Sequence, residues 1–254
     1  MNNETFKDKV VLVTGGTGSF GQKFTETLLK QNLCKKIIIF SRDEFKQHEM
    51  AHRIHDPENK LRFFLGDIRD LSRVERAFSG VDIVVHAAAL KQVPALEFNP
   101  LEAIKTNVLG TQNIIDASLN KKIKKVVLVS TDKAVNPINL YGATKLCAEK
   151  LMIAANAYRT TSDSPPSFSV VRYGNVVGSR GSIVEVLKNQ KDRKTATLTH
   201  PDMTRFWITL DKGVELVMDA LSLMKGGEIF IPKLPAMKVS DLISTMIPNC
   251  EVKV

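Results

Sequence analysis

Residues 9–21 read Lys9-Val10-Val11-Leu12-Val13-Thr14-Gly15-Gly16-Thr17-Gly18-Ser19-Phe20-Gly21. The continuous apolar run that ends at glycine predicts a strand buried on both faces of a parallel sheet. Helical periodicity follows over residues 22–31. Glycines between a strand and a helix allow a tight turn, close approach of a pyrophosphate and close packing of the helix on the strand. We therefore expect a dinucleotide-binding turn, with the phosphates at the helix N-terminus.

The same turn supplies the first group of expected cofactor contacts. They are Gly15, Thr17, Gly18, Ser19, Phe20 and Gly21. The next predicted strand, Lys36 to Phe40, ends in Ser41, Arg42 and Asp43, where a dinucleotide fold recognises the adenosine ribose. An arginine accommodates a 2′-phosphate, so Ser41 and Arg42 favour NADP over NAD. The alternative for Asp43 is that it caps the following helix.

Further strands alternate with helices along the chain. We expect strands at residues 61–65, 82–85, 126–130 and 168–172, and a long helix at residues 101–119. This order predicts an α/β fold, a Rossmann-like doubly wound parallel sheet, with ligands at the carboxyl ends of the strands. The loops after the third and fourth strands add the expected cofactor contacts Asp67, Ile68, Ala87, Ala88, Ala89 and Lys91. Asp67 can bind the adenine amine, or it can simply start a helix-entry turn.

The candidate catalytic residues come after the fifth strand. Tyr141 and Lys145 are four apart and share one face of the predicted helix. An ammonium beside a phenol lowers the pKa of the phenol, which is otherwise about 10, so we expect Tyr141 to act as a base towards an alcohol. Asp132 and Lys133 offer an acid and a second base, which oxidation alone would not require. The alternative for Lys133 is a structural ion pair with Asp132.

The character of the chain changes after residue 172. Residues 173–182 are rich in glycine and contain cations, and we expect residues 173–254 to form a smaller substrate lobe beside a cofactor domain of residues 1–172. The candidate substrate contacts are Lys91, Asn175, Ser179, Arg180 and Arg205. The two arginines are candidates for a clamp on a diphosphate or sugar, and the alternative is that both are ordinary surface arginines.

Composition limits the other classes of function. The chain has 254 residues, a net charge of +9 and 43% hydrophobic residues, which suits one α/β domain. No apolar run reaches the length of a membrane span and none forms a signal segment, so we expect a cytoplasmic protein with no membrane partner. Aromatic residues are too few to interleave with the lysines, which disfavours nucleic acid. Three cysteines, Cys34, Cys147 and Cys250, lack metal-ligand spacing.

The motifs at residues 14–21, 86–91 and 141–145 resemble those of the extended short-chain dehydrogenase/reductase family. Within that family, residues 130–145 and 172–181 are similar to the inverting 4,6-dehydratases that act on UDP-N-acetylglucosamine, and the likeness covers essentially the whole chain. Lys133 and Tyr141 favour this type, because glucose-type retaining relatives carry glutamate at the first position and membrane-anchored relatives often carry methionine at the second.

The resemblance implies a reaction and a set of roles. Tyr141, with Lys145, takes the proton from O4 while NADP⁺ takes hydride from C4, and Thr131 orients O4. Lys133 then removes the C5 proton and Asp132 protonates the departing C6 hydroxyl. The resemblance also implies a homo-oligomer whose product enters surface or flagellar glycans, as in pseudaminic acid synthesis. Family members usually continue beyond the point that matches Val254 with a segment that closes over the uridine nucleotide, so we expect the substrate lobe to be incomplete.

Three other functions stay open from the sequence. A sugar-nucleotide 4-epimerase would use Thr131, Tyr141 and Lys145 but would not need Asp132 with Lys133. A retaining 4,6-dehydratase would give a product of the same mass that differs in configuration at C5. A non-catalytic NADP-binding regulator would have no use for a phenolate. An assay for loss of water separates the dehydratases from the other two.

Overall fold

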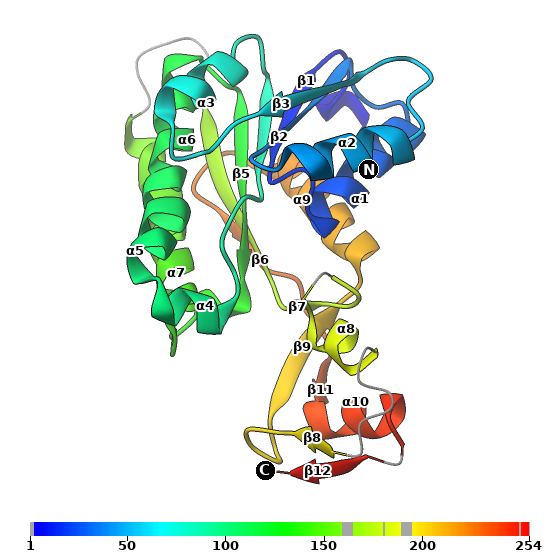
Figure 1. Ribbon diagram of the computed structural model, residues 1–254. Helices are drawn as coiled ribbons and strands as arrows, with labels where there is room; N and C mark the ends of the chain where they lie inside the picture. Colours follow the sequence, from blue (N-terminus) through cyan, green and yellow to red (C-terminus); the bar gives the residue numbers. More distant parts are fainter. Residues whose placement is uncertain (1–2, 159–164, 180, 189–194, 249, 254) are drawn as a thin grey trace.

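The computed structural model describes residues 3–158, 165–179, 181–188, 195–248 and 250–253, and it has a large α/β part with a smaller lobe beside it (Figure 1). The large part is built on a seven-stranded sheet in the order β10-β6-β5-β4-β1-β2-β3. Its strands are β1 (Val10–Thr14), β2 (Lys36–Ser41), β3 (Leu61–Leu65), β4 (Ile83–His86), β5 (Lys125–Thr131), β6 (Ser167–Tyr173) and β10 (Ile229–Phe230). The predicted strands are confirmed, with ends that differ by one or two residues.

All the pairings in this sheet are parallel. β1 lies at the centre, and Thr14 at its carboxyl end is the register partner of Phe40 on β2 and of His86 on β4. The chain runs outward from β1 in one direction to β2 and β3, and in the other to β4, β5 and β6. The strand order therefore reverses between β1 and β4, and ligands bind at such a switch point in open α/β sheets.

Helices cover both faces of the sheet and bury alternate residues of each strand (Figure 1). On β1, Val11 and Val13 belong to one hydrophobic core and Leu12 to the other, as the two-residue period of a strand requires. The first core is completed by α1 (Ser19–Lys30), α2 (Glu44–Arg53) and α9 (Leu210–Leu223). The second is completed by α3 (Leu71–Ala77), α6 (Gly110–Asn120) and α7 (Leu140–Ala154).

The long helix expected at residues 101–119 is not uniform. It comprises α5 (Pro100–Ala103), a π-helical segment η2 (Ile104–Leu109) and then α6. A π turn accommodates an extra residue, which a 3.6-residue periodicity does not signal. The remaining short helices of the large part are η1 (Asn3–Thr5), α4 (Val93–Phe98), η3 (Asp132–Ala134) and η4 (Ala155–Tyr158).

The smaller lobe has two small sheets and a core of its own. Its elements are β7 (Asn175–Val176), α8 (Ile183–Lys188), β8 (Thr195–Thr197), β9 (Thr204–Ile208), β11 (Ala236–Lys238), α10 (Val239–Met246) and β12 (Glu251–Lys253). The prediction that all of residues 173–254 belong to the lobe is wrong for two elements. α9 packs in the first core, and β10 extends the large sheet beside β6. None of the helices in the described ranges is long and apolar enough to cross a membrane.

The close approach of α1 to the glycine turn gives a test of the fold. A Cβ atom at Gly21 would lie 2.5 Å from the Gly16 Cα, whereas one at Gly213 of α9 would meet only the Tyr173 ring at 3.9 Å. We expect Gly21→Ala to lower the free energy of unfolding by about 1–3 kcal/mol, because backbone must move. Gly213→Ala, the matched control, should raise it by up to about 1 kcal/mol through helix propensity. Urea unfolding measures both, and changes of the same sign would contradict the packing described.

Candidate active site

A cleft of about 970 Å³ opens at the carboxyl ends of the strands, between the large sheet and the lobe. Most of the residues proposed from the sequence line it. They are Gly15, Thr17, Gly18, Ser19, Phe20, Gly21, Ser41, Arg42, Ile68, Ala87, Ala88, Ala89, Lys91, Thr131, Lys133, Tyr141, Lys145, Asn175 and Ser179. A volume of this size lies at the upper end of ordinary ligand pockets and suits a ligand as large as a dinucleotide.

The glycine turn forms a cradle at one end of the cleft. Gly15 has a φ of 64°, and a Cβ atom there would lie 2.8 Å from the Ala88 Cα. Only glycine permits both the left-handed backbone and this close approach of two loops. Gly18 is the N-cap of α1 and has no side chain to cover the helix end. This arrangement fits the pyrophosphate of a dinucleotide at a helix N-terminus.

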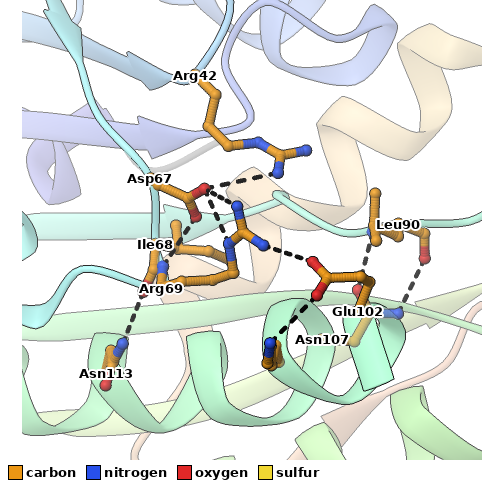
Figure 2. Close-up of polar contacts among 9 residues, drawn as sticks. Arg42, Asp67, Ile68, Arg69, Leu90, Glu102, Asn107 and Asn113 are labelled. Carbon is orange, nitrogen blue, oxygen red and sulfur yellow. Dashed lines mark hydrogen bonds and ion pairs between the residues drawn. The ribbon is translucent and has the colours of Figure 1, made fainter. Parts of the chain in front are cut away.

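A chain of charged groups lies beside the cleft, where β2 and β3 end (Figure 2). Arg42 follows β2, and its Nη1 lies 3.6 Å from Asp67 Oδ2. Arg69 holds the same carboxylate more tightly, with Nε at 2.9 Å and Nη2 at 2.7 Å from Oδ2. Burial raises the pKa of Asp67, but the hydrogen bonds and charge of Arg69, together with the charge of Arg42, outweigh it, so that this pKa is lower than usual.

Asp43 caps a helix, as its predicted alternative role requires, whereas Asp67 does not cap α3. Asp43 is the N-cap of α2 and accepts a hydrogen bond from the Lys46 amide at 3.0 Å, as the capping alternative predicts. Asp67 accepts from the Arg69 amide at 2.9 Å within a turn, while the cap of α3 is Asp70. Asp67 is not among the cleft-lining residues of the described chain, and its carboxylate is occupied by the two arginines.

The η2–α6 helix holds the two loops that carry the expected cofactor contacts (Figure 2). Asn107 donates to the Leu90 carbonyl at 2.9 Å and accepts from the Leu90 amide at 2.8 Å. Asn113 donates to the Ile68 carbonyl at 2.9 Å. Arg69 donates to Glu102 at 2.6 Å. Glu102 lies in α5, which directly precedes η2, so this contact joins the same run of helix to the loop after β3. The loops after β3 and β4 are therefore fixed from one element.

The π-helical segment brings a further residue into the cleft that sequence reasoning missed. Thr106 is 3% exposed and lines the cleft, and its Oγ1 is one of two buried polar side-chain atoms without a hydrogen-bond partner in the described residues. A buried hydroxyl without a partner is costly, so this atom fits a site for a polar group of a bound cofactor. Helical periodicity gives no signal for it, because Thr106 faces the cleft through the π turn.

Lys145 is held by the end of β5. It is 3% exposed, and its Nζ donates to the Val129 carbonyl at 2.8 Å. Burial lowers the pKa of Lys145 to about 8, and the negative charge of Glu149 opposes that change. The helix that carries it begins at a cap in which Asn139 Oδ1 accepts from the Gly142 amide at 2.9 Å. Asn139 thereby fixes the first turn of α7, which contains Tyr141.

The prediction that Lys145 lowers the pKa of Tyr141 is wrong in this structure. Burial raises that pKa to about 12, a hydrogen bond with Thr131 lowers it, and the charge of Asp132 adds to the rise. The physical reason is that desolvation disfavours the phenolate, while the Lys145 ammonium is directed at the Val129 carbonyl. Tyr141 is therefore a protonated phenol at neutral pH in the protein alone.

Asp132 and Lys133 form the ion pair that was the structural alternative for Lys133. The Lys133 Nζ lies 3.0 Å from Asp132 Oδ1 and 2.9 Å from Asn175 Oδ1. The same Asp132 oxygen accepts from Thr131 Oγ1 at 3.0 Å. Lys133 lines the cleft, whereas Asp132 is not among the cleft-lining residues that the structure describes. The pair thus joins the end of β5 to β7 of the lobe, next to Tyr141.

A second lysine, Lys91, faces the same part of the cleft. Burial lowers the pKa of Lys91, the Lys133 charge lowers it further, and the Glu185 charge of α8 opposes both. Two cations near one cleft suit a ligand with negative charge, such as a diphosphate. No group of three or more His, Cys, Asp or Glu in the described parts of the chain is placed to hold a metal ion.

The predicted substrate contacts are only partly assembled. Asn175 and Ser179 line the cleft, whereas Arg205 of β9 donates to the Thr204 carbonyl at 2.8 Å and is not among the cleft-lining residues that the structure describes. Arg180 lies outside the described residues. The sequence missed Gln92 and Tyr173, which line the cleft; they stand beside Lys91 and Arg172 in motifs that were already recognised.

The chain is similar to known proteins over nearly its whole length. The family model described as "Polysaccharide biosynthesis protein" matches residues 11–254. The chain is 50% identical over 251 residues to a protein of Campylobacter jejuni named UDP-N-acetylglucosamine 4,6-dehydratase (inverting), covering 98% of this chain and 74% of that protein. It is 46% identical over 245 residues to a UDP-glucose 4-epimerase of Rickettsia rickettsii, covering 95% of this chain and 71% of the relative.

A solved structure is also similar. The X-ray structure of Pen from Bacillus thuringiensis is 41% identical and superposes with a TM-score of 0.92, covering 98% of this chain and 80% of that one. The predicted Rossmann-like sheet and the likeness to an inverting UDP-N-acetylglucosamine 4,6-dehydratase are thereby confirmed. The chain belongs to the polysaccharide biosynthesis protein family.

Proposed function

We propose that this protein is an inverting 4,6-dehydratase of UDP-N-acetylglucosamine that uses NADP and gives a UDP-4-keto-6-deoxy-L-hexosamine. The 50% identity to the Campylobacter jejuni dehydratase over 98% of the chain supports this activity. The observation that carries it is the position of the Lys133 amine, which is held by Asp132 and Asn175 in the same cleft as Tyr141. Oxidation alone needs Tyr141, whereas removal of water needs a second acid and base.

The first half of the proposed reaction oxidises C4. A nicotinamide cofactor would supply the hydride chemistry at C4 and C6 and, in its oxidised form, would add a positive charge to the cleft. Tyr141 takes the O4 proton, and Thr131, already hydrogen-bonded to Tyr141, orients O4. Lys145, which lines the same cleft one helical turn from Tyr141, would contact the cofactor, and the positive charge of the bound nicotinamide would favour the phenolate that this step requires. The cradle at Gly15 and the Thr106 hydroxyl would hold the cofactor in place.

The second half removes water. The C4 ketone acidifies C5–H. A proton passed from Lys133 to Asp132 across their 3.0 Å contact would leave a neutral amine that takes the C5 proton, giving the enolate, and an acid that protonates the C6 hydroxyl. The hydroxyl leaves as water when the C5–C6 double bond forms, and the ion pair is restored. Once C6 is reduced, solvent supplies a proton to C5 on the opposite face, and Tyr141 releases the O4 proton to solvent. One water has then been lost, and each protein group is back in its first protonation state.

Several finer points belong to the same proposal. Arg42 at the end of β2 supports NADP, and the lobe residues Asn175 and Ser179 support a sugar nucleotide at that side of the cleft. The exposed apolar side chains Phe98 and Leu101 support a homo-oligomer. We place the enzyme in the cytoplasm, and its product in the synthesis of surface or flagellar glycans, from the family resemblance.

A sugar-nucleotide 4-epimerase is the second candidate, because the Rickettsia rickettsii relative bears that name. Incubation of the protein with UDP-N-acetylglucosamine and NADP⁺ in deuterated water separates the possibilities. A dehydratase gives a product that has lost one water and has taken up deuterium at C5, and NMR coupling constants give the C5 configuration. A product of unchanged mass means an epimerase, a D-configured product means a retaining dehydratase, and no product contradicts an enzymatic role on this substrate.

The choice of cofactor is tested at Arg42. Arg42→Ala removes the cation that would contact the 2′-phosphate, so we expect NADP⁺ binding to weaken by about 1.5–3 kcal/mol, roughly 10- to 150-fold, with NAD⁺ binding nearly unchanged. Isothermal titration calorimetry with each cofactor measures the two affinities, and NAD⁺ serves as the internal control. Equal loss for both cofactors would exclude Arg42 as the NADP selector.

The role of Lys133 is tested by proton exchange at C5. Lys133→Met keeps an unbranched apolar chain and removes the amine, so deuterium uptake at C5 should fall by roughly 10²–10⁴-fold. Lys91→Met is the matched control from the same cleft; it should raise KM for the substrate and leave the exchange step largely intact. Normal exchange in Lys133→Met, or its loss in Lys91→Met alone, would transfer the role of base to another residue.

A further inference from the structure

Glu149 of α7 is a buried carboxylate that the proposed reaction does not use. It is 1% exposed. Arg172 of β6 donates to both of its oxygens, from Nε to Oε1 at 3.1 Å and from Nη2 to Oε2 at 2.5 Å. Ser130 of β5 donates to Oε1 at 2.5 Å. A buried charge is tolerated when it is paired and hydrogen-bonded in this way, so the surroundings are built for an ionised carboxylate.

Glu149 contacts the same end of β5 as the candidate catalytic residues of α7. Three successive residues at the end of β5 are each bound by a different residue of α7. The contacts are Val129 O with Lys145 Nζ at 2.8 Å, Ser130 Oγ with Glu149 Oε1 at 2.5 Å, and Thr131 with the Tyr141 hydroxyl. Ser130 is also the register partner of Arg172. Glu149 is therefore the point at which β5, β6 and α7 are joined, one helical turn from Lys145.

We propose that Glu149 is a positioning residue for the reaction: it fixes the end of β5 against α7 and keeps a negative charge one turn from the Lys145 ammonium. This inference rests on the proposed roles of Tyr141 and Lys145. Glu149 touches neither substrate nor cofactor in this account. It acts through Lys145, whose ammonium lines the cleft and donates to the Val129 carbonyl, and through Ser130, which precedes the Thr131 that binds Tyr141.

The charges around Lys145 support this role. Burial lowers the pKa of Lys145 to about 8, and Glu149 opposes that change. The other titratable and charged groups near this pair are His86 of β4, Tyr141 of α7, and Tyr173 and Arg172 of β6. Burial and the Lys145 charge lower the pKa of His86 to about 3, and burial raises the pKa of both tyrosines, so these three are neutral near pH 7. Glu149 is thus the anion that keeps Lys145 charged.

Removal of the Glu149 charge should lower the pKa of Lys145, because that charge raises it. The reaction needs a charged Lys145, so activity falls as the pH rises through the Lys145 pKa. Glu149→Gln keeps the shape and removes the charge, so that pKa should fall, and the alkaline limb of kcat/KM should move to lower pH by about one unit. An NMR titration of ¹³C-labelled lysines, with Lys145 assigned by Lys145→Arg, should show the same shift without any turnover.

Glu228→Gln is the matched control. Glu228 accepts a hydrogen bond from Ser169 at 2.6 Å, as Glu149 does from Ser130, but it lies beside β10 and is not among the groups that shift Lys145. This control should lower the melting temperature and leave the Lys145 midpoint unchanged. A lower melting temperature with an unchanged Lys145 midpoint in Glu149→Gln would reduce Glu149 to a structural residue and overturn the inference.

Two further variants keep the test decisive. If Glu149→Gln does not fold, the double variant Glu149→Gln/Arg172→Met can be used, because it leaves no unpaired buried cation. It should shift the Lys145 midpoint in the same direction, by a smaller amount. An unchanged midpoint in the double variant contradicts the inference. Lys145→Met tests the proposed function separately. Normal turnover in that variant would contradict the role of Lys145 in the reaction, while the NMR midpoints would still show whether Glu149 sets its charge.

Discussion

The structure depends on one constraint: all seven strands of the large sheet run parallel, so their carboxyl ends meet at one edge. The strands β1 to β6 then deliver their following loops to the same cleft. β1 brings the glycine cradle, β2 brings Arg42, β4 brings Lys91, and β5 brings Thr131 and Lys133. Groups that are far apart in sequence can therefore act on one substrate.

Burial sets the electrostatics of this cleft. Desolvation favours the neutral form of every ionisable group, so it raises the pKa of Tyr141 and lowers that of Lys145. In the proposed reaction, Tyr141 must lose its proton in surroundings where burial makes that loss costly. The hydrogen bond with Thr131 offsets part of this cost, and the Glu149 charge opposes the effect of burial on Lys145. Perturbed groups of this kind gather at functional sites rather than in ordinary cores.

The sequence predicted the sheet and most of the cleft, because apolar runs bounded by glycine and polar turns are local signals. It missed what depends on tertiary structure. The direction of the Tyr141 pKa follows from burial, which spacing from Lys145 does not reveal. Thr106 reaches the cleft through a π turn that has no periodic signature. β10 has only two residues, and its place beside β6 follows from pairing at the sheet edge.

The proposed function depends on Tyr141 acting in oxidation at C4 and Lys133 acting in proton removal at C5. Rapid mixing of cofactor-loaded protein with UDP-N-acetylglucosamine tests these two roles most directly. The absorbance of reduced nicotinamide reports oxidation at C4 alone. We predict that Tyr141→Phe shows no rise, because it lacks the ionisable oxygen, whereas Lys133→Met oxidises C4, cannot remove the C5 proton and accumulates reduced cofactor. A rise at the wild-type rate in Tyr141→Phe, or accumulation in neither variant, would contradict the account.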